Sequence, residues 1–288
     1  MRLKALKICF ALGTTGSAFA LTINHVDRID TIFSKTQAAT TNSFCSNPTA
    51  LWDFNWDKRD PVSLINPCEL VRLQKNGNDA ELEDLISSHT PTATRHLIFI
   101  RHGQYHTEFK EDEKRTLTAL GKKQAIATGL RLREITQDKF TYSRVVESSM
   151  TRAIETCGHI REELGITSAE RTDMLREGSP ISPVPNFRNW RPETSVFTDG
   201  PRIEAAFRKF VHRASTSQKQ DSFEIVVCHA NVIRYFVCRA LQMPPEAWLR
   251  ISLRHGSLTW LTIHPSGTVS MKCLGEAGHM SHSLLSTE

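Results

Sequence analysis

Residues 96–103 read His-Leu-Ile-Phe-Ile-Arg-His-Gly. A short apolar run of this kind is typical of a strand buried on both faces of a sheet. It ends abruptly at Arg101-His102-Gly103. In parallel sheets, ligands bind beyond the carboxyl ends of the strands. The stretch therefore predicts a buried strand over residues 96–100 that presents Arg101 and His102 at one edge of a sheet.

Apolar runs typical of strands alternate with segments of helical spacing through the rest of the chain. Strands are expected at 143–147, 223–228, 257–264 and 268–274, and helices at 117–134 (with Thr118 as N-cap), from the second strand through 164, at 202–214 and at 232–241. Strands that alternate with helices predict an α/β fold with a mostly parallel central sheet flanked by helices. The strand at 223–228 ends in His229, so we expect His102 and His229 at the same edge.

Composition excludes several classes of protein. The formal net charge is +5, and the first 26 residues hold +3 of it as Arg2, Lys4 and Lys7, so the remaining +2 is too small to predict nucleic-acid binding. Seven cysteines are scattered without a Cys-x-x-Cys, which favours reduced thiols over a disulfide framework or zinc site. We expect no metal and no cofactor, because no cluster of His, Asp and Glu has ligand spacing.

The first 26 residues are basic, free of acid and carry an apolar run from residue 8 to 23. Three interpretations stay open: a mitochondrial leader, a weak single-pass anchor slightly short of the bilayer core, or a secretory signal, since residues 18–20 read Ala-Phe-Ala. Residues 27–51 include a Ser/Thr-rich stretch without acid and predict a flexible linker. We expect residues 52–91 to hold a short tryptophan-containing motif and a connecting segment, residues 92–281 to form the domain that carries the chemistry, and residues 282–288 to form a polar tail.

Chemistry-bearing side chains follow the predicted strands. Ser148-Ser149-Met150-Thr151-Arg152 comes after the second strand and opens a helix, whose N-terminus would add backbone N–H donors for an anion. Glu177 lies ahead of a proline-rich loop. Gly103 is small enough to let a phosphate approach the backbone. Phosphoryl transfer to an imidazole needs a neutral nucleophile, fixed guanidinium donors and a carboxylic acid for the leaving group, and each of these side chains alone would carry little weight.

In combination, these motifs closely resemble the histidine phosphatase superfamily, in its phosphoglycerate-mutase-like branch. That branch has Arg-His-Gly, Ser-x-x-x-Arg-Ala-x-x-Thr and a late histidine, matched here at Arg101, Ser148 and His229. The resemblance implies that His102 is the nucleophile, that Arg101, Arg152, His229 and Gly103 bind phosphate, and that Glu177 is the acid and then the base. No Glu-Arg-His-Tyr-Gly segment of the cofactor-dependent mutases occurs, so mutase activity is not expected.

The chain is most similar to the mitochondrial protein phosphatases of this branch, over about residues 52–280. The resemblance implies phosphoprotein substrates, a homo-oligomer and a mitochondrial membrane reached through the N-terminal segment. The residues that match a multimerisation motif are Trp52, Asp53, Asn55, Trp56 and Asp57. Two tryptophans in a polar extension are costly to leave in water, although they could instead pack on their own domain. A Kelch-domain adaptor is doubtful, because residues 75–81 lack the acidic docking motif. The rival functions are a small-metabolite phosphatase and a scaffold protein.

Overall fold

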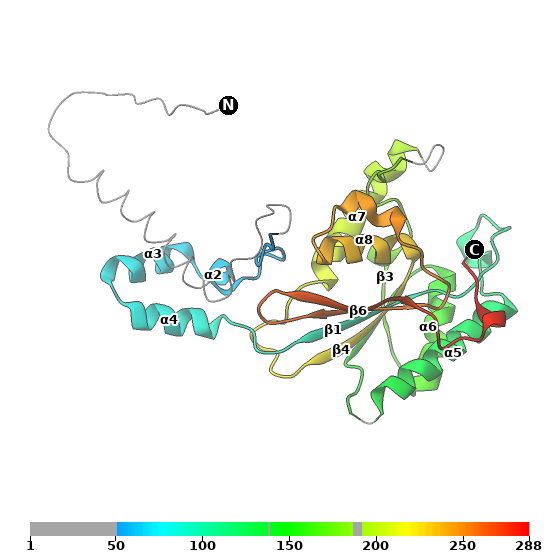
Figure 1. Cartoon of the computed structure of the whole chain (residues 1–288), viewed down its shortest axis with the longest axis horizontal. Coiled ribbons are helices and arrows are strands. Elements are labelled where there is room, and N and C mark those ends of the chain that lie inside the picture. Colours follow the sequence, from blue (N-terminus) through cyan, green and yellow to red (C-terminus); the bar gives the residue numbers. More distant parts are fainter. Residues whose placement is uncertain (1–50, 138, 187–191, 288) are drawn as a thin grey trace. The chain divides into compact units, whose positions relative to one another are not determined.

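The computed structural model describes residues 51–137, 139–186 and 192–287 (Figure 1). The predicted leader (1–26) and nearly all of the predicted linker (27–51) lie outside the described residues. One compact unit runs from Asp53 to Glu288. Within the described part of the chain, no helix combines the length and the apolar character needed to cross a membrane.

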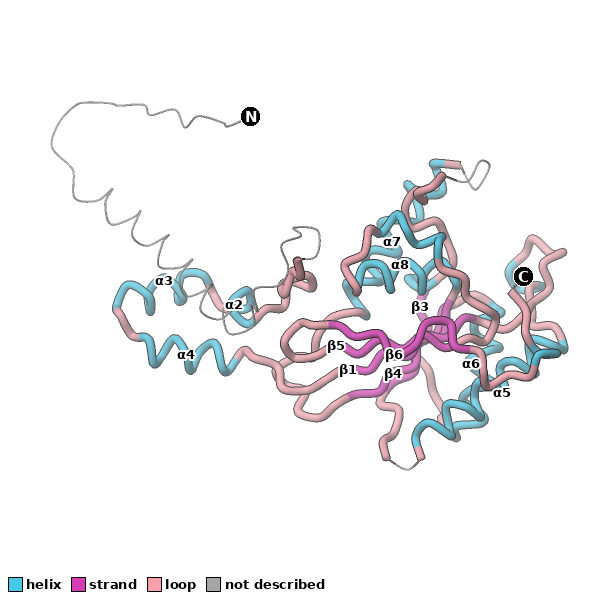
Figure 2. The backbone as a smooth tube through the Cα atoms, in the orientation of Figure 1, coloured by secondary structure: helices cyan, strands magenta, loops and turns pink. Residues whose placement is uncertain are grey.

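A single six-stranded sheet forms the centre of this unit (Figure 2). Its strands are β1 (Arg95–Arg101), β2 (Arg144–Ser148), β3 (Glu170–Thr172), β4 (Ser222–Cys228), β5 (Leu258–Ile263) and β6 (Val269–Glu276). The order is β3-β2-β4-β1-β5-β6. Pairing is parallel from β3 through β1, whereas β5 runs antiparallel to β1 and forms a hairpin with β6. The mostly parallel α/β sheet predicted from the sequence is therefore confirmed.

The helices are α2 (Pro61–Leu64), α3 (Pro67–Asn76), α4 (Asp79–Ser88), α5 (Ala119–Thr136), α6 (Thr151–Leu164), α7 (Glu193–Phe210) and α8 (Ala230–Ala240), with short 3-10 turns η2 (Asp112–Lys114), η3 (Asp173–Leu175), η4 (Pro245–Arg250) and η5 (His282–Leu284). Local sequence explains their ends. The Thr118 hydroxyl accepts the Gly121 N–H at the start of α5, as predicted. α6 stops at Gly165, which takes a left-handed φ of 68°.

The two faces of the sheet bury separate apolar cores. Alternate strand residues point to opposite faces, so Leu97 and Phe99 of β1 join the core under α7 and α8, whereas Ile98 and Ile100 join the core under α5 and α6. Figure 1 shows these two helix pairs on opposite sides of the strands. Because both faces are covered, side chains can reach a ligand only beyond the strand ends.

Some boundaries differ from the prediction. The helix expected at 202–214 runs from Glu193 to Phe210 and contains Pro201. β3 was not predicted, and only three residues form it. The connecting segment expected at 52–91 contains α2, α3 and α4. α3 begins at Asn66, whose side chain accepts the Cys68 N–H, and ends at Gly77 with φ 65°.

The segment from Asp53 to Asp57 packs on its own catalytic unit. The Trp56 indole N–H donates to the Gly267 carbonyl at 2.7 Å, and its ring lies 5.8 Å from that of Phe207. Asp57 forms an ion pair with Arg213 at 2.8 Å. Trp56 and Asp57 therefore pack on the domain of their own chain, which was the alternative interpretation of this segment. That the segment also drives assembly stays a prediction.

Candidate active site

The ends of β1 and β4 bring the two predicted histidines together. Arg101 is paired with Cys228 in the parallel register, so His102 and His229 both follow directly at the same sheet edge. Their ring centroids lie 5.1 Å apart. His102 lines a cleft of about 540 Å³, whose other lining residues include Arg101, Tyr105, Arg115, Met150, Arg152, Glu177, Asn231, Arg234 and Thr287. Four residues predicted for phosphoryl chemistry, Arg101, His102, Arg152 and Glu177, therefore line one cleft, and the ring of His229 lies beside that of His102.

His102 is held in one tautomer. Its Nδ1 lies 2.9 Å from the Gly103 carbonyl oxygen, which can only accept, so the ring proton is on Nδ1. Its Nε2 accepts the Nε–H of Arg152 at 3.2 Å and therefore carries the lone pair. Burial, followed by the charge of Arg152, holds the pKa of His102 well below its usual range. The ring is therefore neutral, with its lone pair directed toward a guanidinium.

Arg152 lies in the first turn of α6 and is almost fully buried. Asp112 holds it from one side, with its carboxylate 3.5 Å from Nη1. The Tyr105 ring supports it from another, 4.6 Å from the guanidinium carbon. That ring also contacts the edge of His102 at 5.0 Å between centroids. A guanidinium fixed in this way keeps its donors oriented toward a phosphoryl group.

Two details of the phosphate-binding prediction need correction. The Thr151 N–H at the start of α6 bonds to the Asp112 carboxylate at 3.0 Å, so that donor is already used. Gly103 does not open its backbone to phosphate, because its N–H bonds to the Thr156 hydroxyl. A Cβ on Gly103 would lie 2.5 Å from the Gly121 carbonyl oxygen. Its small size therefore allows close packing against α5, and its carbonyl fixes His102.

His229 begins α8 and is completely buried. Its Nε2 lies 2.8 Å from the Ser148 hydroxyl. That hydroxyl oxygen accepts the Met150 N–H, so its own proton can be donated to Nε2. The ring proton then lies on Nδ1, which has no hydrogen-bond partner among the described residues. Burial, and then Arg152, lower the pKa of His229 well below its usual range. A neutral ring whose Nδ1–H has no acceptor among the described residues could donate a hydrogen bond to a phosphoryl oxygen.

Glu177 lies after η3 and lines the same cleft. Burial raises the pKa of Glu177, against the opposing Gly178 N–H and the charge of Arg152. Gly178 donates to its Oε1 at 3.0 Å. A carboxyl group with a raised pKa keeps a protonated fraction closer to neutral pH, as a general acid requires.

His255 lies beside the site, with its ring centroid 5.5 Å from that of His102, although it belongs to none of the motifs that selected the other residues. It is 1% exposed, and its Nε2 lies 3.0 Å from Nη2 of Arg101. The tail predicted at 282–288 also reaches the cleft, since the Thr287 carbonyl accepts from Nη1 of Arg101 at 2.8 Å. Just before this tail, the His279 side chain is only 4% exposed. Neither contact is visible in local spacing, because residues far apart in the chain make them.

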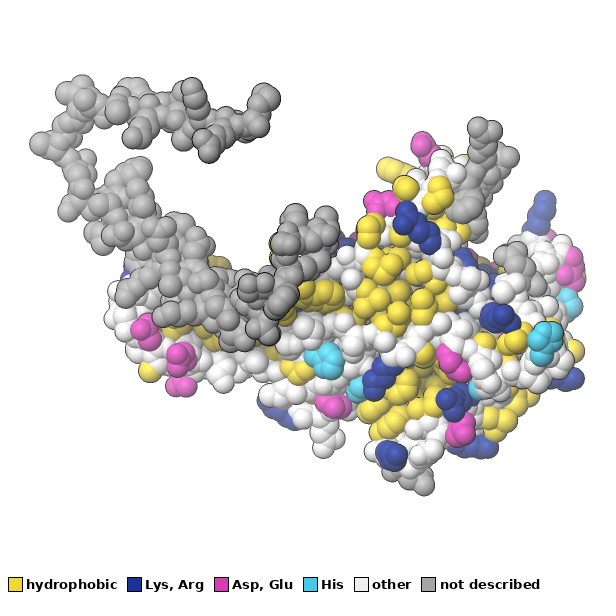
Figure 3. All heavy atoms as spheres, viewed as in Figure 1, with side chains coloured by type: hydrophobic (Ala, Val, Ile, Leu, Met, Phe, Trp, Pro, Cys, Tyr) yellow, Lys and Arg dark blue, Asp and Glu magenta, His cyan; other side chains and the backbone are white. Residues whose placement is uncertain are grey.

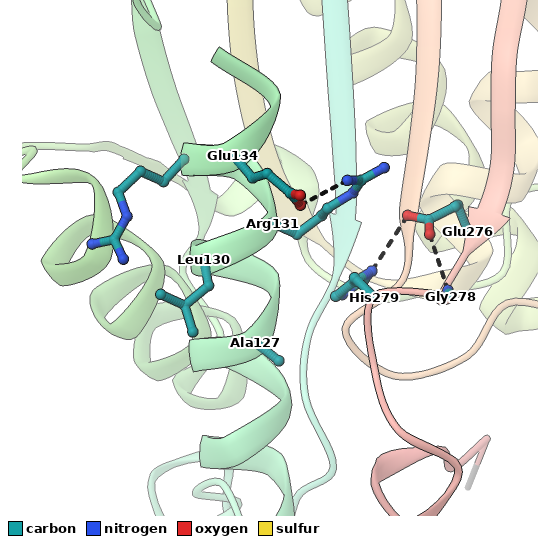
Figure 4. A pocket seen from close by; sticks show the side chains of 8 residues that line it. Ala127, Leu130, Arg131, Glu134, Glu276, Gly278 and His279 are labelled. Atoms are coloured by element: carbon teal, nitrogen blue, oxygen red, sulfur yellow. Dashed lines mark hydrogen bonds and ion pairs between the residues drawn. The ribbon is translucent and has the colours of Figure 1, made fainter. Parts of the chain in front are cut away.

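A second hollow, between α5 and the end of β6, has a different character. Figure 4 shows Arg131 bonded to Glu134 of the same helix, and Glu276 bonded to His279 and to the Gly278 N–H. These groups satisfy one another at the wall of the hollow. The hollow is thus lined by side chains that pair largely with one another, whereas the cleft beside His102 gathers several arginines.

The surface charges follow no single pattern on the face that Figure 3 shows, where Lys and Arg are interspersed with Asp and Glu. Among residues 51–137, 139–186 and 192–287, no group of three or more His, Cys, Asp and Glu side chains is arranged to hold a metal ion. The cleft beside His102 is instead lined by arginines, namely Arg101, Arg115, Arg152 and Arg234.

Comparison with known proteins agrees with this geometry. A family model described as the histidine phosphatase superfamily, branch 1, matches residues 97–180 and 186–273. The mitochondrial serine/threonine-protein phosphatase PGAM5 of Xenopus laevis is 50% identical over 232 residues, which cover 81% of this chain and 82% of that protein. The human protein of the same name is 48% identical over 231 residues, or 80% and 78% of the two chains. A crystal structure of phosphoglycerate mutase from Plasmodium falciparum is 31% identical, with a TM-score of 0.47 and coverage of 66% of this chain and 94% of the other.

Proposed function

This chain belongs to branch 1 of the histidine phosphatase superfamily, and from that premise we propose that it hydrolyses phosphoserine and phosphothreonine on proteins through a phosphohistidine at His102. It is a phosphomonoester hydrolase. The names of its Xenopus and human relatives support protein substrates and a mitochondrial location. The cleft of about 540 Å³ has room for a phosphorylated side chain together with adjoining atoms.

In the first half of the reaction, Nε2 of His102 attacks phosphorus, and the bond from phosphorus to the serine or threonine oxygen breaks. Arg101 and Arg152 bind the equatorial oxygens, and the His229 N–H donates to one of them. Glu177 gives its proton to the leaving oxygen, so the product is an alcohol rather than an alkoxide.

In the second half, a water molecule attacks the phosphohistidine. Glu177, now a carboxylate, takes a proton from that water, and the N–P bond breaks to regenerate neutral His102 and inorganic phosphate. The same side chain thus acts as acid and then as base. A pKa raised by burial suits both tasks, because the group must change its protonation state near the working pH.

The observation that carries this proposal is the contact between His102 and Arg152. A lone pair on Nε2, 3.2 Å from the Arg152 Nε, places the nucleophile beside the cation that would bind the phosphoryl group. The hydrogen bond from Nδ1 to the Gly103 carbonyl keeps that lone pair in place. A histidine with only a structural role would not need both arrangements.

The experiment that tests the substrate class compares kcat/KM for phosphothreonine and phosphoserine peptides with values for sugar phosphates and nucleoside monophosphates. We expect the peptides to be preferred by about tenfold or more, which corresponds to about 1.4 kcal/mol. The His102→Ala variant, purified in parallel, corrects for contaminating phosphatases. An equal or greater value for the small molecules would favour a metabolite phosphatase. Failure to hydrolyse any phosphomonoester would favour a scaffold.

We also propose that residues 1–26 direct the chain to mitochondria and hold it on a membrane. The support is the basic, acid-free composition of this apolar segment. A fluorescent fusion of the whole chain should colocalise with mitochondria and resist extraction with carbonate, and removal of residues 1–26 should release it. Entry of the fusion into the secretory pathway would contradict the proposal.

A further inference from the structure

The C-terminal tail is fixed against the active site by polar contacts. The Gln124 side-chain amide donates to the Leu284 carbonyl at 2.7 Å and to the Ser286 hydroxyl at 2.9 Å. The backbone N–H of His255 donates to the backbone carbonyl of Ser286 at 2.9 Å. These bonds place Thr287 in the lining of the catalytic cleft. The tail thus forms part of the wall beside the reacting groups.

The Arg101 guanidinium donates hydrogen bonds to three acceptors at this wall. Its Nη1 donates to the Leu253 carbonyl at 2.6 Å and to the Thr287 carbonyl at 2.8 Å. Its Nη2 donates to Nε2 of His255 at 3.0 Å. Two acceptors on one nitrogen and a third on the next fix the plane of the guanidinium, which has no conformational freedom of its own beyond the side-chain torsions.

The direction of these bonds determines the state of His255. A guanidinium only donates, so Nε2 of His255 must accept and the ring proton must lie on Nδ1. Nδ1 lies 2.9 Å from the Ser286 hydroxyl, which can accept that proton. Burial, followed by the charge of Arg101, lowers the pKa of His255 to about 3, in agreement with a neutral ring. The tail serine therefore keeps the imidazole in the tautomer that Arg101 needs.

These three acceptors are two backbone carbonyls and an imidazole nitrogen, and each is uncharged. Together they constrain the orientation of the Arg101 guanidinium from one side of the cleft. Since Arg101 lines the cleft beside His102, the residues that hold its guanidinium also set the direction of its remaining N–H groups.

We propose that His255 and the tail residues Ser286 and Thr287 are positioning elements of the active site, which act through Arg101 to orient its guanidinium toward the phosphoryl group. None of them touches the reacting atoms. The proposal rests on the proposed phosphatase function, and it assigns the tail an activating role. Loss of the tail or of the His255 acceptor should weaken binding of the phosphoryl group in the transition state.

The test uses the full chain and p-nitrophenyl phosphate, which any phosphomonoesterase of this kind can hydrolyse. His255→Leu removes the acceptor, and we expect kcat/KM to fall by about tenfold to a hundredfold, the loss typical of one hydrogen bond to a charged group. His255→Gln supplies an amide oxygen and should restore most of the loss. His282→Leu, an exposed tail histidine, is the matched control and should behave as wild type.

Two further measurements separate positioning from general damage. The affinity for orthovanadate, an oxyanion analogue of the transferring group, should fall in His255→Leu while the melting temperature stays close to that of His282→Leu.

Removal of residues 286–288 should lower kcat/KM by a factor similar to that of His255→Leu. Combination of either change with Arg101→Ala should add little, because all of them act through one guanidinium.

The outcomes are distinct from those of the function test. If the wild-type chain does not hydrolyse p-nitrophenyl phosphate, the phosphatase function itself fails. If it does, and the truncated chain is equally or more active, the positioning role is overturned. Full additivity of His255→Leu with Arg101→Ala would overturn it as well.

Discussion

The carboxylate of Asp57 and the guanidinium of Arg213 form an ion pair at 2.8 Å in which each side chain is only 1% exposed. The Arg213 backbone N–H also donates to the Asp57 carboxylate at 2.9 Å, and its side chain bonds to the Phe54 carbonyl. A segment that precedes the first strand is thus attached to the end of α7 by a buried charge pair. The pair links residues 53–57 to the catalytic unit.

We predict that Asp57→Asn destabilises the folded protein by about 3–5 kcal/mol, because it leaves a buried guanidinium without its counter-charge. Chemical unfolding followed by tryptophan fluorescence would measure the loss. Asp53→Asn is the matched control in the same segment. Asp53 is exposed and its side chain bonds only locally, to the Asn55 N–H, so its loss should be below about 1 kcal/mol. Equal effects of the two substitutions would contradict this assignment.

The same pair predicts a pH dependence. Burial alone would raise the pKa of Asp57, but the hydrogen bonds and charge of Arg213 hold it below the ordinary value of 3.8. A carboxyl with a depressed folded-state pKa contributes stability that is complete above its unfolded pKa and lost as pH falls through the folded value. The difference in unfolding free energy between wild type and Asp57→Asn should therefore be constant from pH 7 to 5 and shrink below about pH 4. A difference that shrinks between pH 7 and 5 would mean that another group is responsible.

Substitution of Trp56 should affect the stability of the folded chain as well as its assembly. Trp56 contacts Phe207 and Gly267 of its own unit, so Trp56→Ala should lower stability by about 3–5 kcal/mol whatever the oligomeric state. We still predict that the segment drives self-assembly, and that Trp56→Ala shifts the chain from a higher oligomer to dimers with lower activity on phosphopeptides. Light scattering of chains that lack residues 1–50 would measure the mass. The melting temperature must be recorded beside it, since an unchanged mass in a destabilised variant would show that Trp56 only anchors the segment.

The sequence predicted the sheet edge well because strand periodicity and the motifs after each strand are local. His102, Arg152 and His229 each follow a strand or begin a helix, and the parallel sheet then aligns them. His255 could not be found in this way. It lies in the loop between η4 and β5, and its partners Arg101 and Ser286 come from the first strand and the tail. Nothing in the spacing of these residues indicates that the tail returns to the cleft.

Small residues were also misread, for a related reason. The Gly103 position indicated a phosphate-binding backbone, but its contact is with Gly121 of α5, which is a tertiary contact. The N-terminus of the helix that begins at Thr151 was expected to add backbone N–H donors for an anion, and one of them, the Thr151 N–H, is bonded to Asp112 instead. In both cases the residue type was compatible with two roles, and only the packing of a distant segment decides between them.

Glu177→Gln should slow hydrolysis most for substrates with poor leaving groups. A threonine alkoxide needs a proton, so we expect kcat for a phosphothreonine peptide to fall by about 10²–10⁴-fold, whereas nitrophenolate leaves with far less help. Activity on the peptide should also decline as pH rises through the raised pKa of Glu177, because the acid is then deprotonated. Glu193→Gln, on the exposed start of α7, is the control. Equal losses for both substrates would mean that Glu177 is not the acid.

The covalent intermediate gives the most direct prediction. His102→Ala should reduce turnover by at least about three orders of magnitude, because the nucleophile acts as a unit with its supporting donors. Rapid quenching of wild-type protein with ³²P-labelled substrate should trap one phosphoryl group on the chain, labile in acid and stable in base, and peptide mapping should place it on residues 96–103. His282→Ala should label as wild type does, since that ring is exposed on the tail. A folded His102→Ala variant that keeps substantial activity, or a label that survives acid, would require a different nucleophile in the cleft.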